Sequence, residues 1–534
     1  MFDFLKRRQR HRAQSGGGEV TEAIKSTEPA AAAGPLSGSL QHNKTGLTAL
    51  FCDDNDFIVR EFELPLSDGI PAALFFLDGL VSGDAINDAI LRPLMLESRR
   101  LQPHSMPEIN SVGDLCAALL PTAEIKITGE LEQVVAGCLM GDSVLMVEGM
   151  AQAVVINTKG FERRSVQEPQ TEMVVRGPRE GFTEVLRVNT SLIRRRLKTP
   201  HLRLKMMEIG EKTATAVCLA WLDNVANPAL VKEVERRLRT IDTDAILNSG
   251  YIEEYIEDAP LSVFQTIGYS EKPDIVVAKL LEGRCALIID GTPFVLTMPM
   301  LFVESFQSPE DYAVRPYIAM FLRVIRVIAF FISLTAPALY VAMTLFHQEL
   351  IPTTLLFTIA ASSEGIPFNS VVETSLMLLT FEILKEAGIR LPKPVGQAIS
   401  IVGALVMGQT AIEAGIAGAP VVIVIAFTAV AGFLVPNLSD AVTILRWYLL
   451  VLSALLGGYG ITLGLMTILI HLAAIESFGA VYLYPFSPLN VGDMKDGILR
   501  APLWSLRTRP GVLRPLDRVR QRMQKPHFGQ DDTQ

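Results

Sequence analysis

The sequence predicts an α/β soluble N-terminal region made of two similar subdomains, followed by an all-α polytopic membrane domain. Two observations support this. The 534-residue chain is 20% charged, but residues 317–484 hold only 6 Lys or Arg and 8 Asp or Glu in 168 positions. In the charged part, two pairs of segments repeat at nearly the same spacing. This composition excludes a purely soluble enzyme, a disordered chain and a transporter that occupies the whole length.

Net charge divides the chain further. Residues 46–316 carry −14 and residues 317–484 carry −2, whereas the ends, 1–45 and 485–534, carry +3 and +4. An acidic soluble body argues against nucleic acid as a partner. Basic ends beside a membrane region favour contact with anionic lipid on the cytoplasmic side. No apolar stretch follows the basic segment Met1–Arg12, so we expect no signal peptide and a cytoplasmic soluble body.

Catalytic and metal-binding motifs are absent from the sequence. It has no Walker A run, no GxGxxG after a strand, no GxSxG, no HExxH and no Cys/His metal cluster. We therefore expect no enzymatic activity, no catalytic residue, no metal and no cofactor. The five cysteines form no CxxC pair, so we expect reduced, buried, structural thiols. They are Cys52, Cys116, Cys138, Cys218 and Cys285.

The repeat in the soluble region consists of two pairs of matching segments. Leu77–Val81 matches Leu222–Ala226 at an offset of 145 residues, and each is followed by a helical pattern. Gly141–Gly149 matches Gly283–Gly291 at an offset of 142 residues. Each copy is typical of a strand, two helices and two short strands joined by an acidic-Gly turn. The similar offsets favour two α/β subdomains of one design over chance similarity of short patterns.

These patterns predict six regions along the chain. A flexible leader rich in Gly, Ala, Ser and Pro precedes two cytosolic subdomains that a connector joins, and a membrane domain and a basic cytoplasmic tail follow. We also expect the acidic stretch Asp53–Asp56 to form a hairpin turn. The expected bounds are 1–46 for the leader, 47–165 and 200–316 for the subdomains, 166–199 for the connector, 317–484 for the membrane domain and 485–534 for the tail.

The connector combines a Gly-Pro turn with a basic helix end. Gly177-Pro178 sets a turn, and Thr183 can cap the helix that follows. That helix ends at an Arg run, where the helix dipole favours cations. The run is either a solvated helix end or a contact with a neighbouring subunit or a lipid phosphate. The motif and interface candidates are Arg176, Gly177, Pro178, Arg179, Glu180, Gly181, Phe182, Arg194, Arg195 and Arg196.

The membrane region contains apolar runs of crossing length. Arg315, Arg323 and Arg326 mark the cytoplasmic end of the first run. The second run is interrupted at Ser362–Pro367 and the last at Gly457–Gly460. Because both ends are expected in the cytoplasm, the number of crossings is even, four to six, and the shorter runs are either spans or re-entrant. The runs are Val324–Phe346, Thr353–Leu384, Gln397–Ile412, Val421–Val435 and Ala441–Ile475.

Acidic residues inside these runs are candidates for an ion pathway, because an unpaired carboxylate in hydrocarbon is costly. Glu364 lies in the Ser-Ser-Glu-Gly-Ile-Pro break, and Glu373 lies on the helix after it. In a symmetric oligomer, rings of such acids attract cations. The pore candidates are Glu364, Glu373, Ser362 and Ser363. For the acids near segment ends, Glu382, Glu386, Glu413 and Glu476, the alternative is that they reach the membrane interface.

Several motifs, in this order, resemble the A subunits of the GerA-type spore germinant receptors. The resemblance covers about residues 47–510, nearly the whole chain. The motifs are Arg176–Phe182, Asn189–Arg196, Pro316–Tyr317, Ser363–Phe368 and Pro436–Asn437. The architecture of that family, a two-part cytosolic domain followed by a membrane domain, matches the organisation expected above.

The resemblance implies a signal-transducing subunit in the inner membrane of a bacterial spore. Such subunits are thought to oligomerise into a nutrient-gated cation channel and to act with a transporter-like B subunit and a lipoprotein C subunit. An accessory germination channel of a paralogous branch is an alternative, as are a secondary transporter and a non-conducting scaffold. The membrane region shows no internal repeat, which disfavours a transporter.

Overall fold

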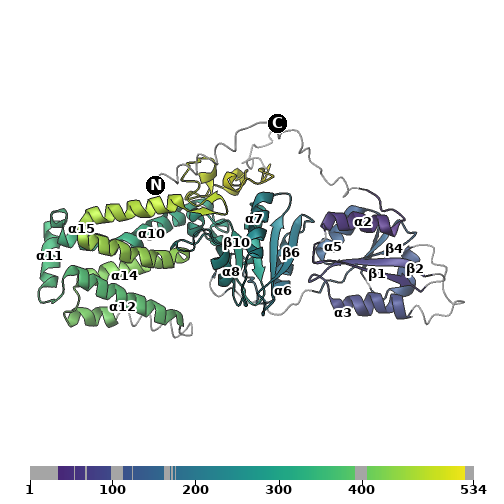
Figure 1. The fold of residues 1–534 in the computed structure, drawn as a ribbon, viewed down its shortest axis with the longest axis horizontal. Helices are drawn as coiled ribbons and strands as arrows, with labels where there is room; N and C mark the ends of the chain where they lie inside the picture. The colour runs from purple at the N-terminus through teal and green to yellow at the C-terminus, as the bar shows by residue number, and fades with distance from the viewer. Residues whose placement is uncertain are drawn as a thin grey trace, which may run out of the picture. The chain divides into compact units, whose positions relative to one another are not determined.

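The computed structural model describes residues 34–97, 112–160, 169, 172, 174, 176–390 and 406–522, apart from residues 53, 66–68 and 123 (Figure 1). The chain divides into two compact units. Unit 1 lies within Met1–Glu162 together with Lys198–Pro200, and unit 2 lies within Arg163–Leu197 and His201–Gln534.

Unit 1 is a five-stranded antiparallel sheet with helices on both faces (Figure 1). The strand order is β1-β2-β4-β5-β3. Alternate residues of the central strands are buried on opposite faces: Leu145 packs with Ile90 and Leu115, whereas Val144 packs with Leu47. The elements are α2 (Leu40–Phe51), β1 (Phe57–Leu64), β2 (Ile70–Leu77), α3 (Gly83–Ile86), η1 (Asn87–Leu91), η2 (Pro93–Glu97), α4 (Val112–Leu119), β3 (Ile125–Thr128), α5 (Leu131–Met140), β4 (Ser143–Val147) and β5 (Ala153–Ile156).

The expected leader, residues 1–46, is wrong at its C-terminal end. Helix α2 begins at Leu40, after Ser39, whose hydroxyl accepts a hydrogen bond from the His42 N–H. The Gly- and Ser-rich composition of this stretch obscured a helix that needs only a short apolar stripe, including Leu40 and Leu47, to pack on the sheet. Residues 1–33 lie outside the described residues.

The expected hairpin turn at Asp53–Asp56 is also wrong. The described residues of this stretch connect helix α2 to strand β1, and the chain leaves the helix through Cys52 in the left-handed conformation. All five cysteines are free, as expected, and four of them are buried. Cys52 is exposed because it follows the last helical residue rather than facing the sheet.

The α/β part of unit 2 repeats this sheet. Its strand order, β6-β7-β9-β10-β8, is the same as in unit 1, and all pairs are antiparallel. The repeated segments end β2 and β7 and form β4 and β9, so the prediction of two similar α/β subdomains is confirmed. The elements are α6 (Leu186–Arg196), β6 (Leu202–Ile209), β7 (Thr215–Leu222), α7 (Pro228–Arg239), α8 (Ser249–Ile256), β8 (Gly268–Ser270), α9 (Pro273–Leu281), β9 (Cys285–Ile289) and β10 (Val295–Met298).

The rest of unit 2 is a bundle of apolar helices with short elements before and after it (Figure 1). Among the described residues, two helical runs are long and apolar enough to cross a membrane, Pro316–Leu345 and Pro436–Ala474, with mean hydropathies of 2.1 and 1.9. Residues 397–405 of the expected run Gln397–Ile412 lie outside the described residues. The elements are η4 (Phe302–Phe306), η5 (Pro309–Tyr312), α10 (Pro316–Leu345), η6 (Gln348–Leu350), α11 (Thr353–Ser363), α12 (Ser370–Arg390), α14 (Ala419–Phe433), η7 (Pro436–Leu438), α15 (Ser439–Ala474), β11 (Glu476–Ser477), β12 (Ala480–Val481), η8 (Asp493–Lys495), η9 (Leu503–Ser505) and η10 (Gly511–Leu513).

Helix α15 folds back on itself at Gly457. This residue has φ +61° and ψ −140°, which is not helical. The hydroxyl oxygens of Tyr448 and Thr467 lie 2.8 Å apart, whereas a straight helix would separate these two residues by about 28 Å. The run is therefore a hairpin of two antiparallel halves, each of about 17 or 18 residues and so long enough to cross a bilayer. The expected break at Gly457–Gly460 is present.

The tip of this hairpin packs on the end of α10. The Gly458 N–H donates to His347 Nε2 at 3.2 Å. A Cβ on Gly457 would lie 2.8 Å from the Cβ of Phe346, closer than such atoms approach. Glycine is therefore required at position 457 for two reasons, the backbone conformation and the close contact.

We predict that Gly457→Ala lowers the free energy of unfolding of the purified protein by about 1–3 kcal/mol from backbone strain alone, with the contact to Phe346 adding to the loss. Thermal unfolding in detergent measures it.

The matched control is Gly432→Ala. Gly432 lies in α14 with its nearest neighbour, Arg446 Nη2, 3.9 Å from an added Cβ, so alanine should leave stability unchanged or raise it slightly. Equal losses for the two variants would contradict the special role of Gly457.

Candidate functional site

The motif Arg176–Phe182 contacts both helix α6 and the segment that precedes helix α9. The Glu180 carboxylate forms ion pairs with Arg195 and, at 2.7 Å, with Arg196. The Phe182 N–H donates to the Glu271 carbonyl at 2.7 Å. Partial burial alone would raise the pKa of Glu180, but the hydrogen bonds from the two arginines lower it below its ordinary value. Most residues of the expected connector before Arg176 lie outside the described residues.

The Arg run at the end of α6 makes contacts within its own unit. Arg194 is buried and donates to the Leu202 carbonyl at 3.0 Å. Arg195 and Arg196 keep 36% and 25% of their side chains exposed, so their contact with a neighbouring subunit or lipid stays a prediction.

The expected cap by Thr183 is wrong, because the helix begins later, at Leu186. The Leu186 N–H donates instead to Asp290 Oδ1 at 2.9 Å. Thr183 is held by the side chain of Asn189, which accepts from its N–H at 2.8 Å and donates to its carbonyl at 2.6 Å. The first turn of α6 is therefore anchored to the turn after β9.

The structure brings two of the four pore candidates together. Glu373 is 2% exposed, and its carboxylate accepts a hydrogen bond from the Gly418 N–H at the start of α14. The Ser362 carbonyl oxygen lies at the same glycine, 3.4 Å from an added Cβ. Ser363 and Glu364 are exposed at the end of α11. Whether these four residues line a pore stays a prediction.

A buried ion pair inside the bundle was not predicted from the sequence. Arg446 on α15, with 4% of its side chain exposed, lies 2.9 Å from Glu382 on α12. Its Nε donates to the Ser333 carbonyl on α10 at 2.8 Å. Glu382 therefore does not simply reach the interface. Arg446 is the one arginine of the apolar run Ala441–Ile475, and it could have revealed this pair, because such a cation needs a carboxylate.

A second buried network holds the start of α10. Asp311 and Arg323 are both fully buried and 2.7 Å apart. Arg326 also binds Asp311, at 2.9 Å. Arg323 Nη1 reaches Asp496 Oδ1 at 3.0 Å, and the Tyr312 hydroxyl donates to Asp496 Oδ2 at 2.9 Å. Arg323 and Arg326, expected as interfacial charges, thus join the helix to the turn before it and, through Arg323, to the tail.

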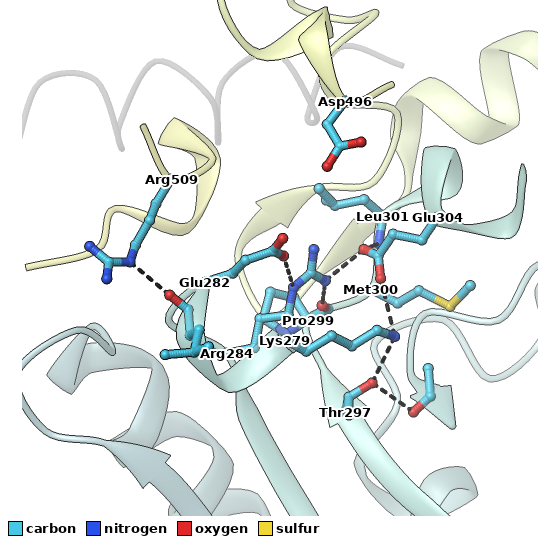
Figure 2. A network of polar contacts seen from close by, with 12 residues as sticks. Lys279, Glu282, Arg284, Thr297, Pro299, Met300, Leu301, Glu304, Asp496 and Arg509 are labelled. Carbon is cyan, nitrogen blue, oxygen red and sulfur yellow. Dashed lines mark hydrogen bonds and ion pairs between the residues drawn. The ribbon is translucent and has the colours of Figure 1, made fainter. Parts of the chain in front are cut away.

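A separate set of ion pairs joins helix α9 to η4 (Figure 2). Arg284, 3% exposed, lies 2.6 Å from Glu304 and 3.3 Å from Glu282. Lys279 lies 3.2 Å from Glu304. Burial alone would raise the pKa of Glu304, but the charges of Arg284 and Lys279 hold it below its ordinary value. Burial raises the pKa of Glu282 despite the two arginines near it.

The described part of the basic tail is folded onto this region. Arg509 Nε donates to the Leu281 carbonyl at 2.7 Å (Figure 2). The Leu516 N–H donates to the Val225 carbonyl at 2.9 Å. Arg520 lies 3.7 Å from Glu282. Residues 523–534 lie outside the described residues.

The end of α15 returns to the same subdomain. His471 Nε2 and the Ser262 hydroxyl lie 2.9 Å apart, and the Phe478 N–H donates to Asp258 at 2.6 Å. Helix α10 therefore begins beside the second α/β subdomain, and helix α15 ends beside it. This polar base of the bundle, where α9, η4, η5, α10 and the tail meet, is the candidate site for coupling the soluble part to the helices.

We predict that Asp311→Ala destabilises the purified protein by about 3–5 kcal/mol, because it removes the closer of the two carboxylates that balance buried Arg323 and leaves only Asp496. Urea or thermal unfolding in detergent measures the loss. Glu386→Ala is the control, since it removes an exposed ion pair with Arg390 and should cost at most about 1 kcal/mol. A loss for Asp311→Ala no larger than the control would contradict a structural role for the buried pair.

Several known proteins are similar to this chain. The chain is 41% identical over 488 residues to "Spore germination protein KA" of Bacillus subtilis (strain 168), covering 91% of this chain and 89% of that protein. It is 40% identical over 480 residues to "Uncharacterized membrane protein YfkQ" of the same organism, covering 90% and 92%. The crystal structure of the N-terminal domain of the A subunit of the Bacillus megaterium spore germinant receptor GerK3 is 31% identical, covers 51% of this chain and 98% of that chain, and gives a TM-score of 0.40.

A family model described as "Bacillus/Clostridium GerA spore germination protein" matches residues 45–512. The match spans most of the chain, from α2 to the tail, and confirms the resemblance that the motifs carry. This chain therefore belongs to the GerA family of spore germination proteins.

Proposed function

We propose that this chain is the membrane subunit of a spore germinant receptor and that several copies form a nutrient-gated cation channel. Family membership and the names of the relatives support the receptor-subunit role. Channel activity and oligomerisation are the finer part of the proposal, and they rest on the physical features described next.

The observation that carries the channel proposal is the polar break between α11 and α12. Ser363, Glu364 and Gly365 are exposed on the single chain, although they lie between apolar helices. A carboxylate and irregular backbone are not tolerated against lipid, so they must face water or protein. Neighbouring copies arranged around a water-filled path meet this requirement.

The buried Glu373 extends the argument. Its carboxylate accepts a hydrogen bond at the N-terminus of α14, and the other end of α14 lies near the α/β subdomain. A movement at the polar break would therefore be passed along α14 toward that subdomain. Arg326 of α10 donates to the Phe306 carbonyl of η4, and Glu304 of η4 pairs with Lys279 of α9, so η4 connects the bundle to α9. This chain of contacts supports a role in passing a change between the soluble part and the helices.

For location and partners we propose the following arrangement. The chain lies in the spore inner membrane, with the α/β subdomains and the tail in the cytoplasm. The return of α15 to the subdomain where α10 begins supports one side for both ends. The expected partners are further copies of the chain, a transporter-like B subunit, a lipoprotein C subunit and membrane lipid, and no nucleic acid. An accessory germination channel, a secondary transporter and a non-conducting scaffold remain the alternatives.

We predict that Glu373→Gln and Glu364→Gln each change the rate of nutrient-triggered potassium release from spores by about fivefold or more, because each removes a charge from the ion path. The spores should carry this chain as the A subunit of their sole receptor. Potassium in the medium is followed by flame photometry, and immunoblots confirm equal protein levels.

The control for this experiment is Glu386→Gln, an exposed acid at the far end of α12, which should leave release within about twofold of the unmodified chain. Unchanged release in both pore variants would contradict the pore assignment. Absence of conductance from the purified oligomer in planar bilayers would favour the scaffold, and substrate uptake by the protein alone in liposomes would favour the transporter.

A further inference from the structure

Helix α8 presents an exposed surface that is aromatic and acidic. Ile252 and Ile256 are buried against the second sheet, whereas Tyr251 and Tyr255 lie four residues apart on the outer side and are 46% and 55% exposed. Glu254 is exposed between them. Exposed tyrosines of this kind are typical of surfaces that contact another protein. We define the acidic surface by the exposed residues Leu247, Tyr251, Glu254 and Tyr255.

The segment around α8 carries an excess of negative charge. Residues 240–262 contain six Asp or Glu and no Lys or Arg. Arg237 of α7 pairs with Asp258 at 2.6 Å, at one end of this segment. Burial and the nearby Glu257 raise the pKa of Glu253 to about 7. A partner that brings positive charge would balance this surface.

The tail presents a surface of the opposite charge. Residues 507–522 contain six Arg and one Asp. The two strands of this segment are paired, because Thr508 and Val519 form a β-bridge and the Arg509 N–H donates to the Arg518 carbonyl at 3.0 Å. The surface is therefore ordered, and it combines exposed arginines with exposed apolar side chains. We define the basic surface by the exposed residues Arg507, Arg514, Leu516, Arg518, Val519 and Arg522.

The two surfaces lie on different sides of the second α/β subdomain. Ile252 of α8 packs with Leu219 of β7, whereas Leu280 of α9 packs with Ala220, the next residue of the same strand. Successive residues of a strand face opposite sides of the sheet, so α8 and α9 cover opposite faces. The tail contacts the end of α9 through Arg509. Among the described residues, no hydrogen bond or ion pair joins the acidic surface to the basic surface of the same chain.

Both surfaces adjoin the same end of the helical bundle. Ser262, which follows α8, lies 2.9 Å from His471 near the end of α15. Asp496, which precedes the basic surface, lies 3.0 Å from Arg323 near the start of α10. Copies inserted in one membrane in the same orientation would therefore present the acidic and basic surfaces at this end of their bundles. A contact between two different surfaces, repeated from copy to copy, closes into a ring when the rotation allows it.

We propose that the acidic surface of one copy docks on the basic surface of the next copy. Arginine guanidinium groups would pair with the carboxylates and pack on the rings of Tyr251 and Tyr255, a favourable arrangement of cation and aromatic face. A second copy fits because each chain carries both surfaces and their charges are complementary. This inference rests on the proposed oligomer and deepens it by assigning the contact, but it does not depend on conduction.

The test is analytical ultracentrifugation of the full-length chain in dodecyl maltoside without added lipid. Two variants each remove one surface without reversing charge: Glu254→Gln with Tyr255→Ser, and Arg514→Gln with Arg518→Gln. We expect each variant to associate with itself about tenfold or more weakly than the unmodified chain, because each loses central contacts of the interface. The control is Glu132→Gln, which neutralises an exposed acid on α5 of unit 1 and should leave association unchanged. Circular dichroism checks that every variant is folded.

Mixing the two variants tests the direction of the contact. Each variant keeps the surface that the other has lost, so an equimolar mixture should form a dimer through the one intact pair and no larger species. Unchanged self-association of the folded variants would overturn the proposed contact while leaving an oligomer built through other surfaces. Absence of the mixed dimer, or association that requires added phosphatidylglycerol, would also overturn it, the latter by identifying anionic lipid as the partner of the tail. A ring that carries no current in planar bilayers would contradict the channel alone.

Discussion

The fully buried ion pair between Asp311 and Arg323 is the interaction on which the arrangement of unit 2 depends. The desolvation cost of two buried charges offsets much of their attraction, so the pair contributes specificity more than stability. Because Arg323 also binds Asp496, the turn before α10, the helix itself and the tail are held in one geometry.

The helical bundle contains a second ion pair that holds its elements together. Arg446 and Glu382 link α15 to α12, and the arginine also reaches α10 through the Ser333 carbonyl. Among apolar helices, where lipid and side chains are similar in polarity, polar contacts and close glycine packing decide which helices adjoin. Gly457 supplies the second kind of contact, since it lets α15 reverse against Phe346.

Much of the fold could be predicted because it depends on local patterns. The low charge of residues 317–484 revealed the helical region, and the repeated segments revealed two sheets of one design. Helix α2 was missed because its apolar stripe is short and follows a Gly- and Ser-rich stretch. The partner of Arg446 was missed because it is 64 residues away in sequence, and the contacts of the tail for the same reason. Pairing over such distances depends on packing, which no local pattern encodes.

The sequence by itself determined the fold class of the soluble and helical parts, the break at Gly457 and the family, because hydrophobic periodicity, glycine placement and motif order are local properties. Only the tertiary structure decided what the charged residues do. It buried Arg323 against Asp311, paired Arg326 with the same carboxylate, placed Glu373 at the start of α14 and left Glu364 exposed. The physical reason is that the role of a charge depends on which partners and how much water surround it, and both are set by elements distant in sequence.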